Sequence, residues 1–292
     1  MHKWRGFSMS EKYDNDVENT WCPGCGNHGT LRILKESLTE SNLEPKEVII
    51  VSGIGQSGKT PHFIKSHFYN GLHGRYLSTA LGVKASNPKL QVIAISGDGC
   101  TLSEGGNHFL HTIRYNPDIV NIISNNGVYG LTKGQASPTS SLGFKTKVQT
   151  FGVINEPFNS PAVAISLNAS FVARAFVGDI DQTKEILKQA IKHKGYALID
   201  LLSPCVSFNK INTFKWYKEN SYYLDETHNP LDREQAMRVA LDLKKLALGI
   251  IYKNPSRPTY EENIRIYDSD PRPLFERDLD KQKLVDLVNT FR

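Results

Sequence analysis

The sequence predicts an α/β fold in which helices cover both faces of a doubly wound, mostly parallel sheet. Two apolar runs of strand length, Gln91–Ser96 and Ile119–Ile123, have no polar alternation, as expected of strands buried on both faces. Segments of helical periodicity separate these runs and the others along the chain, which is the pattern of βαβ units. Turns that follow the strands are therefore expected at the carboxyl edge of one sheet, where ligands of such folds bind.

In the first half of the chain, segments with the spacing of a buried helix face alternate with short apolar runs typical of strands. Leu31, Leu34 and Leu38 are spaced for one buried helix face. Asn87-Pro88 ends a later helix, because proline disfavours helical backbone in the residue before it. The expected elements are a helix after residue 26, a strand at 48–52, a glycine loop at 53–58, a helix opening at His73-Gly74, the strand at 91–96, a helix at 104–115 and the strand leading into Asn125-Asn126.

The second half begins with a long segment, 134–161, that is rich in Ser, Thr, Pro and Gly and has little periodicity. A loop of this length inside a compact domain is functional or mobile, and its position predicts that it lies near a substrate. The expected elements after it are a helix at 162–168, a strand at 171–177, a helix that Asp181 caps and a strand at 197–202.

Three regions are expected. Residues 1–20 form a polar arm, residues 21–216 form the α/β domain, and residues 217–292 form a C-terminal helical and extended tail. The tail has predicted helices near 231–248 and 279–291, separated by proline-rich, charged sequence. It has too little apolar sequence to close a core alone, so we expect it to pack on a partner subunit; a solvated tail is the alternative.

Composition limits the function classes. The chain has 292 residues, of which 39% are hydrophobic and 22% charged, as in a globular protein of ordinary size. The net charge of +5 is mild and scattered, which argues against nucleic-acid binding. No apolar run is long enough to span a bilayer, and the N-terminus lacks the apolar core of a secretory signal, so a cytoplasmic location is expected.

Oxygen ligands follow two of the predicted strands. Asp98 lies in the sequence Gly97-Asp98-Gly99, and Asn126 follows the next strand along the chain. A carboxylate and an amide oxygen suit Mg²⁺, which takes few protein ligands and completes its shell with phosphate and water oxygens. The glycines allow the backbone to approach a diphosphate closely.

Five motifs in a fixed order extend this interpretation. They are Trp21–Gly26 (WCPGCG), Gly53–Lys59 (GIGQSGK), Leu72–Arg75 (LHGR), the pair Gly97–Gly99 and Asn125–Asn126, and Gly127–Thr139 (GVYGLTKGQASPT). Together they resemble the β subunit of two-subunit 2-oxoacid:ferredoxin oxidoreductases over residues 21–216. The resemblance implies a thiamine-diphosphate-binding fold.

The resemblance also implies the site residues. Mg²⁺ would be held by Asp98, Asn126 and the backbone oxygen of Val128, and the carboxylate of the substrate would be bound by Lys59 and Lys133. Residues that match cofactor-lining positions of the family are Ile54, Gly55, Gln56, Ser57, His73, Gly99, Cys100, Gly130 and Leu131.

The four cysteines raise a separate question. A disulfide framework is not expected in a cytosolic protein of this kind, so the pair Cys22 and Cys25 favours metal or redox ligation. By the resemblance, Cys205 matches a further ligand of a [4Fe-4S] cluster, but Gln56 occupies the position where the family has its remaining cysteine. Our hypothesis is that Cys100 replaces this ligand. The alternatives are that Cys100 is a buried, inert thiol and that the cluster is labile or absent.

The resemblance further implies the reaction and the partners. A 2-oxoacid would be decarboxylated with coenzyme A to acyl-CoA and CO₂, electrons would pass through the cluster to ferredoxin, and the reverse carboxylation would also occur. No carboxylate near the aminopyrimidine is evident, since Glu104 lies at the phosphate end, so an α subunit is expected to supply the activating glutamate and most of the selectivity, in an αβ or (αβ)₂ assembly. The expected substrate is 2-oxoglutarate. The alternatives are pyruvate or a broad range of 2-oxoacids, a cluster-free thiamine-diphosphate decarboxylase, and a scaffold with structural zinc.

Overall fold

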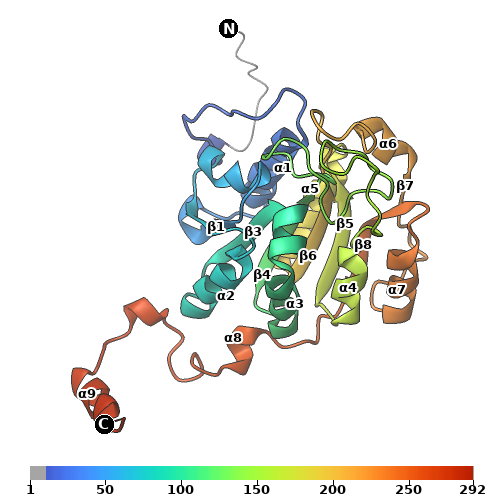
Figure 1. Ribbon diagram of the computed structural model, residues 1–292. Coiled ribbons are helices and arrows are strands. Elements are labelled where there is room, and N and C mark those ends of the chain that lie inside the picture. Colours follow the sequence, from blue (N-terminus) through green and yellow to red (C-terminus); the bar gives the residue numbers. More distant parts are fainter. Residues whose placement is uncertain (1–10, 292) are drawn as a thin grey trace.

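The computed structural model describes residues 11–291 and shows an eight-stranded sheet covered by helices on both faces (Figure 1). The strand order is β2-β1-β3-β4-β6-β5-β8-β7. All neighbouring pairs are parallel except β5 and β8, which are antiparallel. The predicted fold class, a doubly wound and mostly parallel sheet, is confirmed.

The strands are β1 (Val48–Ser52), β2 (His67–Asn70), β3 (Gln91–Gly97), β4 (Ile119–Asn125), β5 (Phe171–Phe176), β6 (Ala197–Leu202), β7 (Ser221–Tyr223) and β8 (Leu246–Lys253). The helices are α1 (Gly26–Glu40), α2 (Tyr76–Ser86), α3 (Gly106–Tyr115), α4 (Ser160–Ser166), α5 (Ile180–Lys192), α6 (Phe214–Glu219), α7 (Arg233–Leu241), α8 (Tyr260–Asn263) and α9 (Lys281–Asn289).

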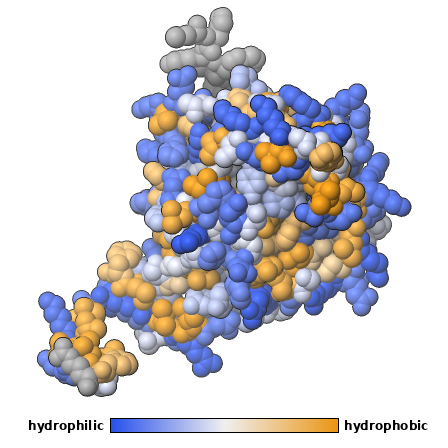
Figure 2. Space-filling model, viewed as in Figure 1, coloured by the Kyte–Doolittle hydropathy of each residue, from blue (hydrophilic) through white to orange (hydrophobic). Residues whose placement is uncertain are grey.

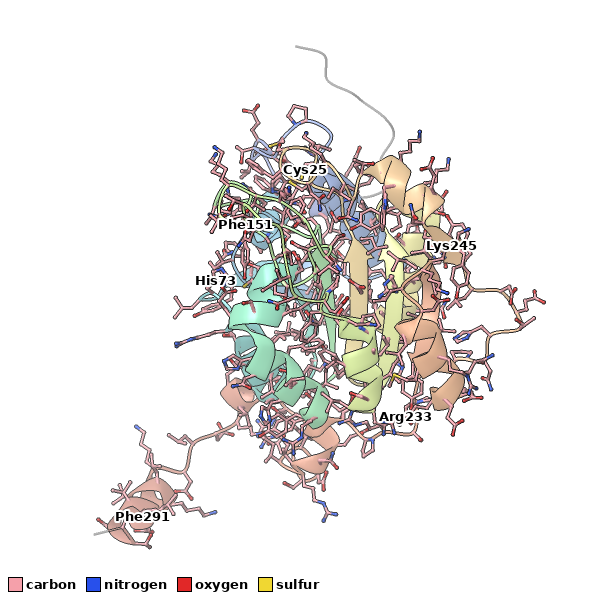
Figure 3. All side chains as sticks on the ribbon, turned by 45° about the vertical axis from the view of Figure 1, so that its right-hand side comes forward. Cys25, His73, Phe151, Arg233, Lys245 and Phe291 are labelled. Carbon is pink, nitrogen blue, oxygen red and sulfur yellow. The ribbon has the colours of Figure 1, made fainter. Side chains whose placement is uncertain are left out.

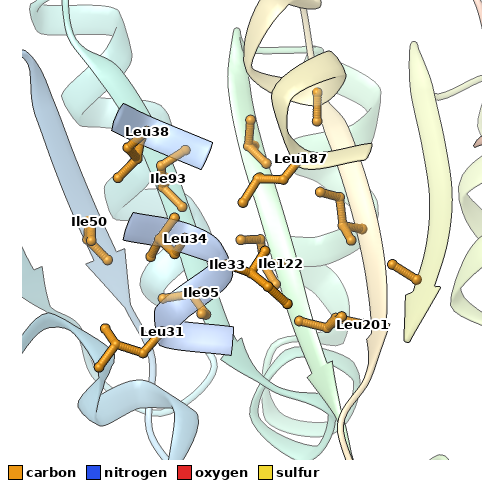
Figure 4. Close-up of a cluster of buried hydrophobic side chains, with 14 of the residues drawn as sticks. Leu31, Ile33, Leu34, Leu38, Ile50, Ile93, Ile95, Ile122, Leu187 and Leu201 are labelled. Atoms are coloured by element: carbon orange, nitrogen blue, oxygen red, sulfur yellow. The ribbon is translucent and has the colours of Figure 1, made fainter. Parts of the chain in front are cut away.

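The core consists of two layers of apolar side chains, one on each face of the sheet. On one face, α1 and α5 pack against the central strands, and Figure 4 shows Leu34 and Leu38 of α1 over Ile93 and Ile95 of β3, with Leu187 of α5 beside them. Helices α2, α3, α4 and α7 cover the opposite face. The predicted face of α1 is therefore confirmed, because Leu31, Leu34 and Leu38 are all buried.

The C-terminal part of the chain differs from the expected arrangement. The helix predicted near 231–248 ends at Leu241, and Leu246–Lys253 instead forms β8, which pairs with β5 and extends the sheet beyond residue 216. Ile251 and Tyr252 of β8 are buried against the helices of one face. β-branched and aromatic residues fit such a half-buried strand, and pairing with β5 overrides the helical spacing. The short strands β2 and β7 were not predicted either.

The N-cap of α5 also differs from the expectation. The helix begins at Ile180, so the capping residue is Asp179, whose side chain accepts a hydrogen bond from the backbone nitrogen of Gln182 at 3.1 Å. Asp181 lies inside the first turn, where its side chain is 96% exposed. The prediction therefore placed the N-cap two residues too late, on the second of two nearby aspartates.

This correction gives a direct test. Replacing Asp179 with alanine is expected to lower the free energy of unfolding by about 1 kcal/mol, because a helix amide loses its acceptor. Asp181→Ala is the matched control and should change stability by less than about 0.5 kcal/mol, as surface substitutions do. Urea denaturation of both variants distinguishes them, and equal losses would contradict the assignment of the cap.

The long irregular segment predicted at 134–161 is confirmed up to residue 159, since residues 126–159 contain no helix or named strand; α4 begins at Ser160, two residues before the predicted helix start. The predicted polar arm lies partly outside the described residues. Within the described part, Tyr13 is fully buried and its hydroxyl donates to the carbonyl oxygen of Leu43 at 2.9 Å. Among residues 11–291, no helix is long and apolar enough to cross a membrane.

Candidate active site

The turns after β1, β2, β3 and β4 enclose one cavity at the carboxyl edge of the sheet. It is lined by Ile54, Gly55, Gln56, Ser57, His73, Gly97, Asp98, Gly99, Cys100, Asn126, Val128, Tyr129, Gly130, Leu131 and Thr132. The structure thus brings together all nine residues expected to line a cofactor and all three expected to hold Mg²⁺. Their roles stay predictions, but their convergence follows from the parallel order of the strands that carry them.

Asp98 is the central polar group of this cavity. It is 1% exposed, and one carboxylate oxygen accepts hydrogen bonds from the hydroxyl groups of Ser137 and Thr139, each at 2.5 Å. Burial raises the pKa of Asp98, and the two hydroxyl donors oppose that effect only in part. Within the described residues, no basic side chain forms an ion pair with it. A divalent cation would compensate this buried charge, so the donor set fits Mg²⁺.

Asn126 and Val128 belong to one tight turn that faces Asp98 across the cavity. The side-chain oxygen of Asn126 accepts a hydrogen bond from the backbone nitrogen of Val128 at 3.0 Å, which is an Asx turn. The preceding residue, Asn125, donates to Asp200 at 2.9 Å and thereby ties the turn to β6. The turn is held from both sides before any ligand binds.

Glycine is required where the loops meet. A Cβ atom on Gly99 would overlap the ring of Tyr129, and one on Gly53 would lie 2.6 Å from the sulfur of Cys100. Because these glycines lack a side chain, the loops pack closely and their backbone amides lie near the cavity, as a diphosphate site needs.

Three cysteines line a second cavity beside the first. Cys22, Cys25 and Cys205 share its wall with Gln56. The sulfur of Cys205 and the Cγ of Gln56 lie 3.9 and 4.0 Å from the position of a Cβ on Gly130. Burial raises the pKa of Cys25, and the neighbouring Cys205 and Cys22 raise it further, while the backbone amide of Asn27 lowers it.

These thiols surround a space and do not meet at a point. Among residues 11–291, no three His, Cys, Asp or Glu side chains form a group that could hold a metal ion. Figure 3 shows Cys25 and Phe151 at the same end of the molecule, far from Phe291 near the C-terminus.

Within the described structure, Cys100 does not line the second cavity, which we call the cysteine cavity. It is 3% exposed, and its sulfur accepts hydrogen bonds from the backbone nitrogens of Ile54 and Gly74, each at 3.2 Å. It lines the first cavity, which we call the cofactor cavity, whereas Gln56 lines both cavities. This placement favours the alternative weighed for Cys100, a buried thiol beside the cofactor, over its hypothetical role as a cluster ligand.

Lys59 and Lys133 follow residues that line the cavity, Ser57 and Thr132, but neither lysine is among the lining residues. Lys59 is half-buried in the turn after the glycine loop, and Lys133 is exposed. Neither forms an ion pair within the described residues. The backbone of Lys133 has φ 80°, a conformation that a residue with a long side chain rarely adopts, and such strain is concentrated at functional sites.

Sequence analysis missed the groups that hold Asp98. Ser137 and Thr139 lie about forty residues after it in the long loop, and only the hydroxyl-rich composition of that loop could have pointed to them. It also missed Tyr129, whose hydroxyl contacts the carboxylate of Glu104 at 3.2 Å.

Family comparisons define the class of protein. The family described as thiamine pyrophosphate enzyme, C-terminal TPP binding domain, matches residues 53–201. The family that describes the C-terminal part of the beta subunit of pyruvate ferredoxin oxidoreductase matches residues 205–269, which include β8. Both the cofactor cavity and the C-terminal strands thus belong to a thiamine-pyrophosphate oxidoreductase architecture.

Individual relatives narrow the class. The 2-oxoacid:ferredoxin oxidoreductase subunit beta of Saccharolobus solfataricus is 46% identical over 261 residues, which cover 84% of this chain and 85% of the relative. The 2-oxoglutarate synthase subunit KorB of Methanocaldococcus jannaschii is 32% identical over 241 residues, covering 78% and 89%. A structure of 2-oxoglutarate:ferredoxin oxidoreductase from Magnetococcus marinus, with 2-oxoglutarate, coenzyme A and succinyl-CoA bound, aligns with a TM-score of 0.89 and 33% identity over 98% of this chain and 97% of that chain. The chain belongs to the β subunits of the 2-oxoacid:ferredoxin oxidoreductases.

Proposed function

We propose that this β subunit, together with an α subunit, decarboxylates 2-oxoglutarate with coenzyme A to succinyl-CoA and CO₂ and passes the electrons to ferredoxin. The reverse carboxylation uses the same site. The observation that carries the proposal is the shared wall of the two cavities: Gln56, Asn126 and Gly130 line both the cofactor cavity and the cysteine cavity. Electrons released at one site therefore have a short path to the other.

Support for 2-oxoglutarate comes from the relatives. The Magnetococcus marinus structure contains that 2-oxoacid and its CoA product, and the Methanocaldococcus jannaschii relative is named for the same substrate. The more similar Saccharolobus solfataricus relative is named only for 2-oxoacids, which keeps a broad range, pyruvate included, as the second candidate.

Asp98, Asn126 and the backbone oxygen of Val128 would hold Mg²⁺, and the glycine-containing turns would hold the diphosphate group of thiamine diphosphate. Thiamine diphosphate supplies the electron sink for cleavage next to the keto group. The protein contributes the uncompensated charge of Asp98, oriented by Ser137 and Thr139. The iron–sulfur cluster would be held by Cys22, Cys25 and Cys205. Gln56 lines the same cavity and occupies the position of the fourth ligand in the family.

The α subunit has two roles in this proposal. It supplies the activating glutamate, since Asp98 is assigned to Mg²⁺ and Glu104, which does not line the cavity, already contacts Tyr129 and His73. It also receives the C-terminal segment. Helix α9 buries none of its residues, and Figure 2 shows hydrophobic side chains on this segment, which lies apart from the sheet. Its exposed apolar residues are Leu284, Val285, Leu287 and Val288.

The tail can be tested separately. Leu284 and Val288 lie one turn apart on α9, so replacing both with Asp removes one apolar stripe. Binding of the α subunit is expected to weaken at least about tenfold, since each buried leucine or valine side chain contributes about 1.5 kcal/mol or more. Folding of the β subunit should be unchanged. Lys283→Ala is the matched control, and gel filtration of the mixed subunits gives the readout; unchanged assembly would exclude this surface.

The lysines predict a defect in substrate binding. Replacing Lys59 or Lys133 with alanine is expected to raise KM for the 2-oxoacid about tenfold or more, because each change removes a charge-assisted hydrogen bond to its carboxylate. Lys147→Ala, in the same long loop and also exposed, is the matched control. Steady-state dye reduction measures KM, and a fall in the rate alone would contradict the assignment.

The whole proposal is tested by purifying this chain with its α subunit. We expect reduction of ferredoxin or a viologen dye that depends on both 2-oxoglutarate and coenzyme A. Iron, sulfide and magnesium should all be present in the complex. Activity of the β subunit alone would contradict the role given to the α subunit, and magnesium without iron would favour the cluster-free decarboxylase.

A further inference from the structure

His73, Glu104 and Tyr129 meet at one wall of the cofactor cavity although they come from three separate segments: two loops and, for Glu104, the end of a short π-helical turn at Cys100–Glu104. The Nδ1 atom of His73 lies 3.3 Å from a carboxylate oxygen of Glu104. The hydroxyl of Tyr129 lies 3.2 Å from each of the two oxygens of the same carboxylate. His73 and Tyr129 line the cavity, whereas Glu104 is not among its lining residues and lies behind them.

The backbone fixes this arrangement. Gly74 has φ 73°, and a Cβ atom there would overlap the carbonyl carbon of Glu104. The loop that carries His73 therefore rests directly on the peptide of Glu104. On the other side, the ring of Tyr129 packs on Gly99 so closely that it leaves no room for a Cβ atom. No side-chain rearrangement is needed to bring the three groups into contact.

We propose that Glu104 is a positioning residue, which orients the imidazole of His73 toward the terminal phosphate of thiamine diphosphate. This inference rests on the proposed function. The carboxylate accepts the Nδ1 proton, so Nε2 is the ring nitrogen left for the cavity. Because Tyr129 contacts both carboxylate oxygens, the carboxylate cannot rotate freely, and the ring that it holds is oriented before the cofactor arrives.

The charges explain why pairing is needed. A lone carboxylate this close to a diphosphate would repel it, whereas here the ring nitrogen of His73 engages the carboxylate of Glu104 at 3.3 Å. The side chains of His73 and Glu104 are 40% and 42% exposed, so solvent screens the pair and its effect on affinity is modest. Glu104 therefore acts mainly by orienting the hydrogen-bond donor of His73, and contributes little net electrostatic attraction for the cofactor.

The experiment uses the complex of both subunits with Mg²⁺. Dissociation constants for thiamine diphosphate and for thiamine monophosphate are measured by calorimetry for the wild type, Glu104→Gln, His73→Gln and the double variant. Glu104→Gln is expected to weaken diphosphate binding about threefold to fivefold, as loss of a partly exposed pair does. Monophosphate binding should change less than about twofold, because the terminal phosphate is missing.

The double variant separates positioning from general disturbance. If Glu104 acts through His73, Glu104→Gln has no further effect in the His73→Gln background. Equal losses for both ligands, an undiminished effect without His73, or no loss at all would each overturn the inference while leaving the proposed function intact. A wild-type complex that binds no thiamine diphosphate would overturn the proposed function, and this inference with it.

Discussion

Replacing Asp98 with asparagine is expected to weaken the binding of Mg²⁺ and thiamine diphosphate by more than about 100-fold, since even residues behind a metal ligand affect affinity 10- to 100-fold. The same variant should make the cofactor-free protein more stable at neutral pH, by about 1 kcal/mol, because a buried charge without a basic partner is removed. The carboxyl group is 1% exposed and burial raises its pKa, so the folded state binds its proton more tightly than the unfolded chain does. Its ionised form therefore opposes folding as pH rises through the folded-state pKa.

Two measurements check this result. Calorimetric titration with Mg²⁺ and thiamine diphosphate gives the affinity, and urea denaturation without metal gives the stability. Asp181→Asn, a change of an exposed acidic residue that does not line the cavity, is the control for loss of one negative charge. A variant that loses both affinity and stability would show that Asp98 is mainly structural, contrary to the proposal.

Replacing Cys25 with serine is expected to remove iron and sulfide from the complex and to reduce electron transfer to ferredoxin to background. Cys25 lines the cysteine cavity with Cys22 and Cys205, and a serine hydroxyl is a much weaker ligand for cluster iron than the thiolate it replaces. Binding of thiamine diphosphate should persist, because Asp98 lies in the neighbouring cavity. Iron analysis and calorimetry on one preparation measure both effects.

Cys100→Ser is the matched control, since its thiol lies in the cofactor cavity and accepts backbone hydrogen bonds there. It should retain the wild-type iron content. If it loses iron as completely as Cys25→Ser, the hypothesis that Cys100 replaces the missing ligand would be correct after all. Gln56→Cys should make the cluster more resistant to loss of iron, because residue 56 faces the cysteine cavity.

Much of the fold could be predicted because local periodicity and burial agree in the central strands. Ile93 and Ile95 lie on a strand buried on both faces, and the leucines of α1 share one helix face, so short-range pattern was sufficient. The prediction failed at Leu246–Lys253. That segment pairs with β5, some seventy residues earlier in the chain, and no local pattern encodes such a partner.

The candidate site shows the same division. The cofactor-lining residues follow strand ends, so their convergence could be anticipated from the parallel order alone. The hydroxyl groups of Ser137 and Thr139 could not be assigned to Asp98 beforehand, because the loop between residues 126 and 159 has no repeating geometry from which a contact can be inferred.

The sequence by itself determined the fold class, the residues at the strand ends and the family, because each depends on order along the chain. Only the tertiary structure decided which cavity each cysteine faces. Cys100 and Gln56 follow neighbouring strands and look interchangeable in the sequence, but Gln56 lines both cavities and so borders Cys22, Cys25 and Cys205, whereas Cys100 lines only the cofactor cavity. This placement is set by how the loops pack against each other, and that packing is a property of the folded chain.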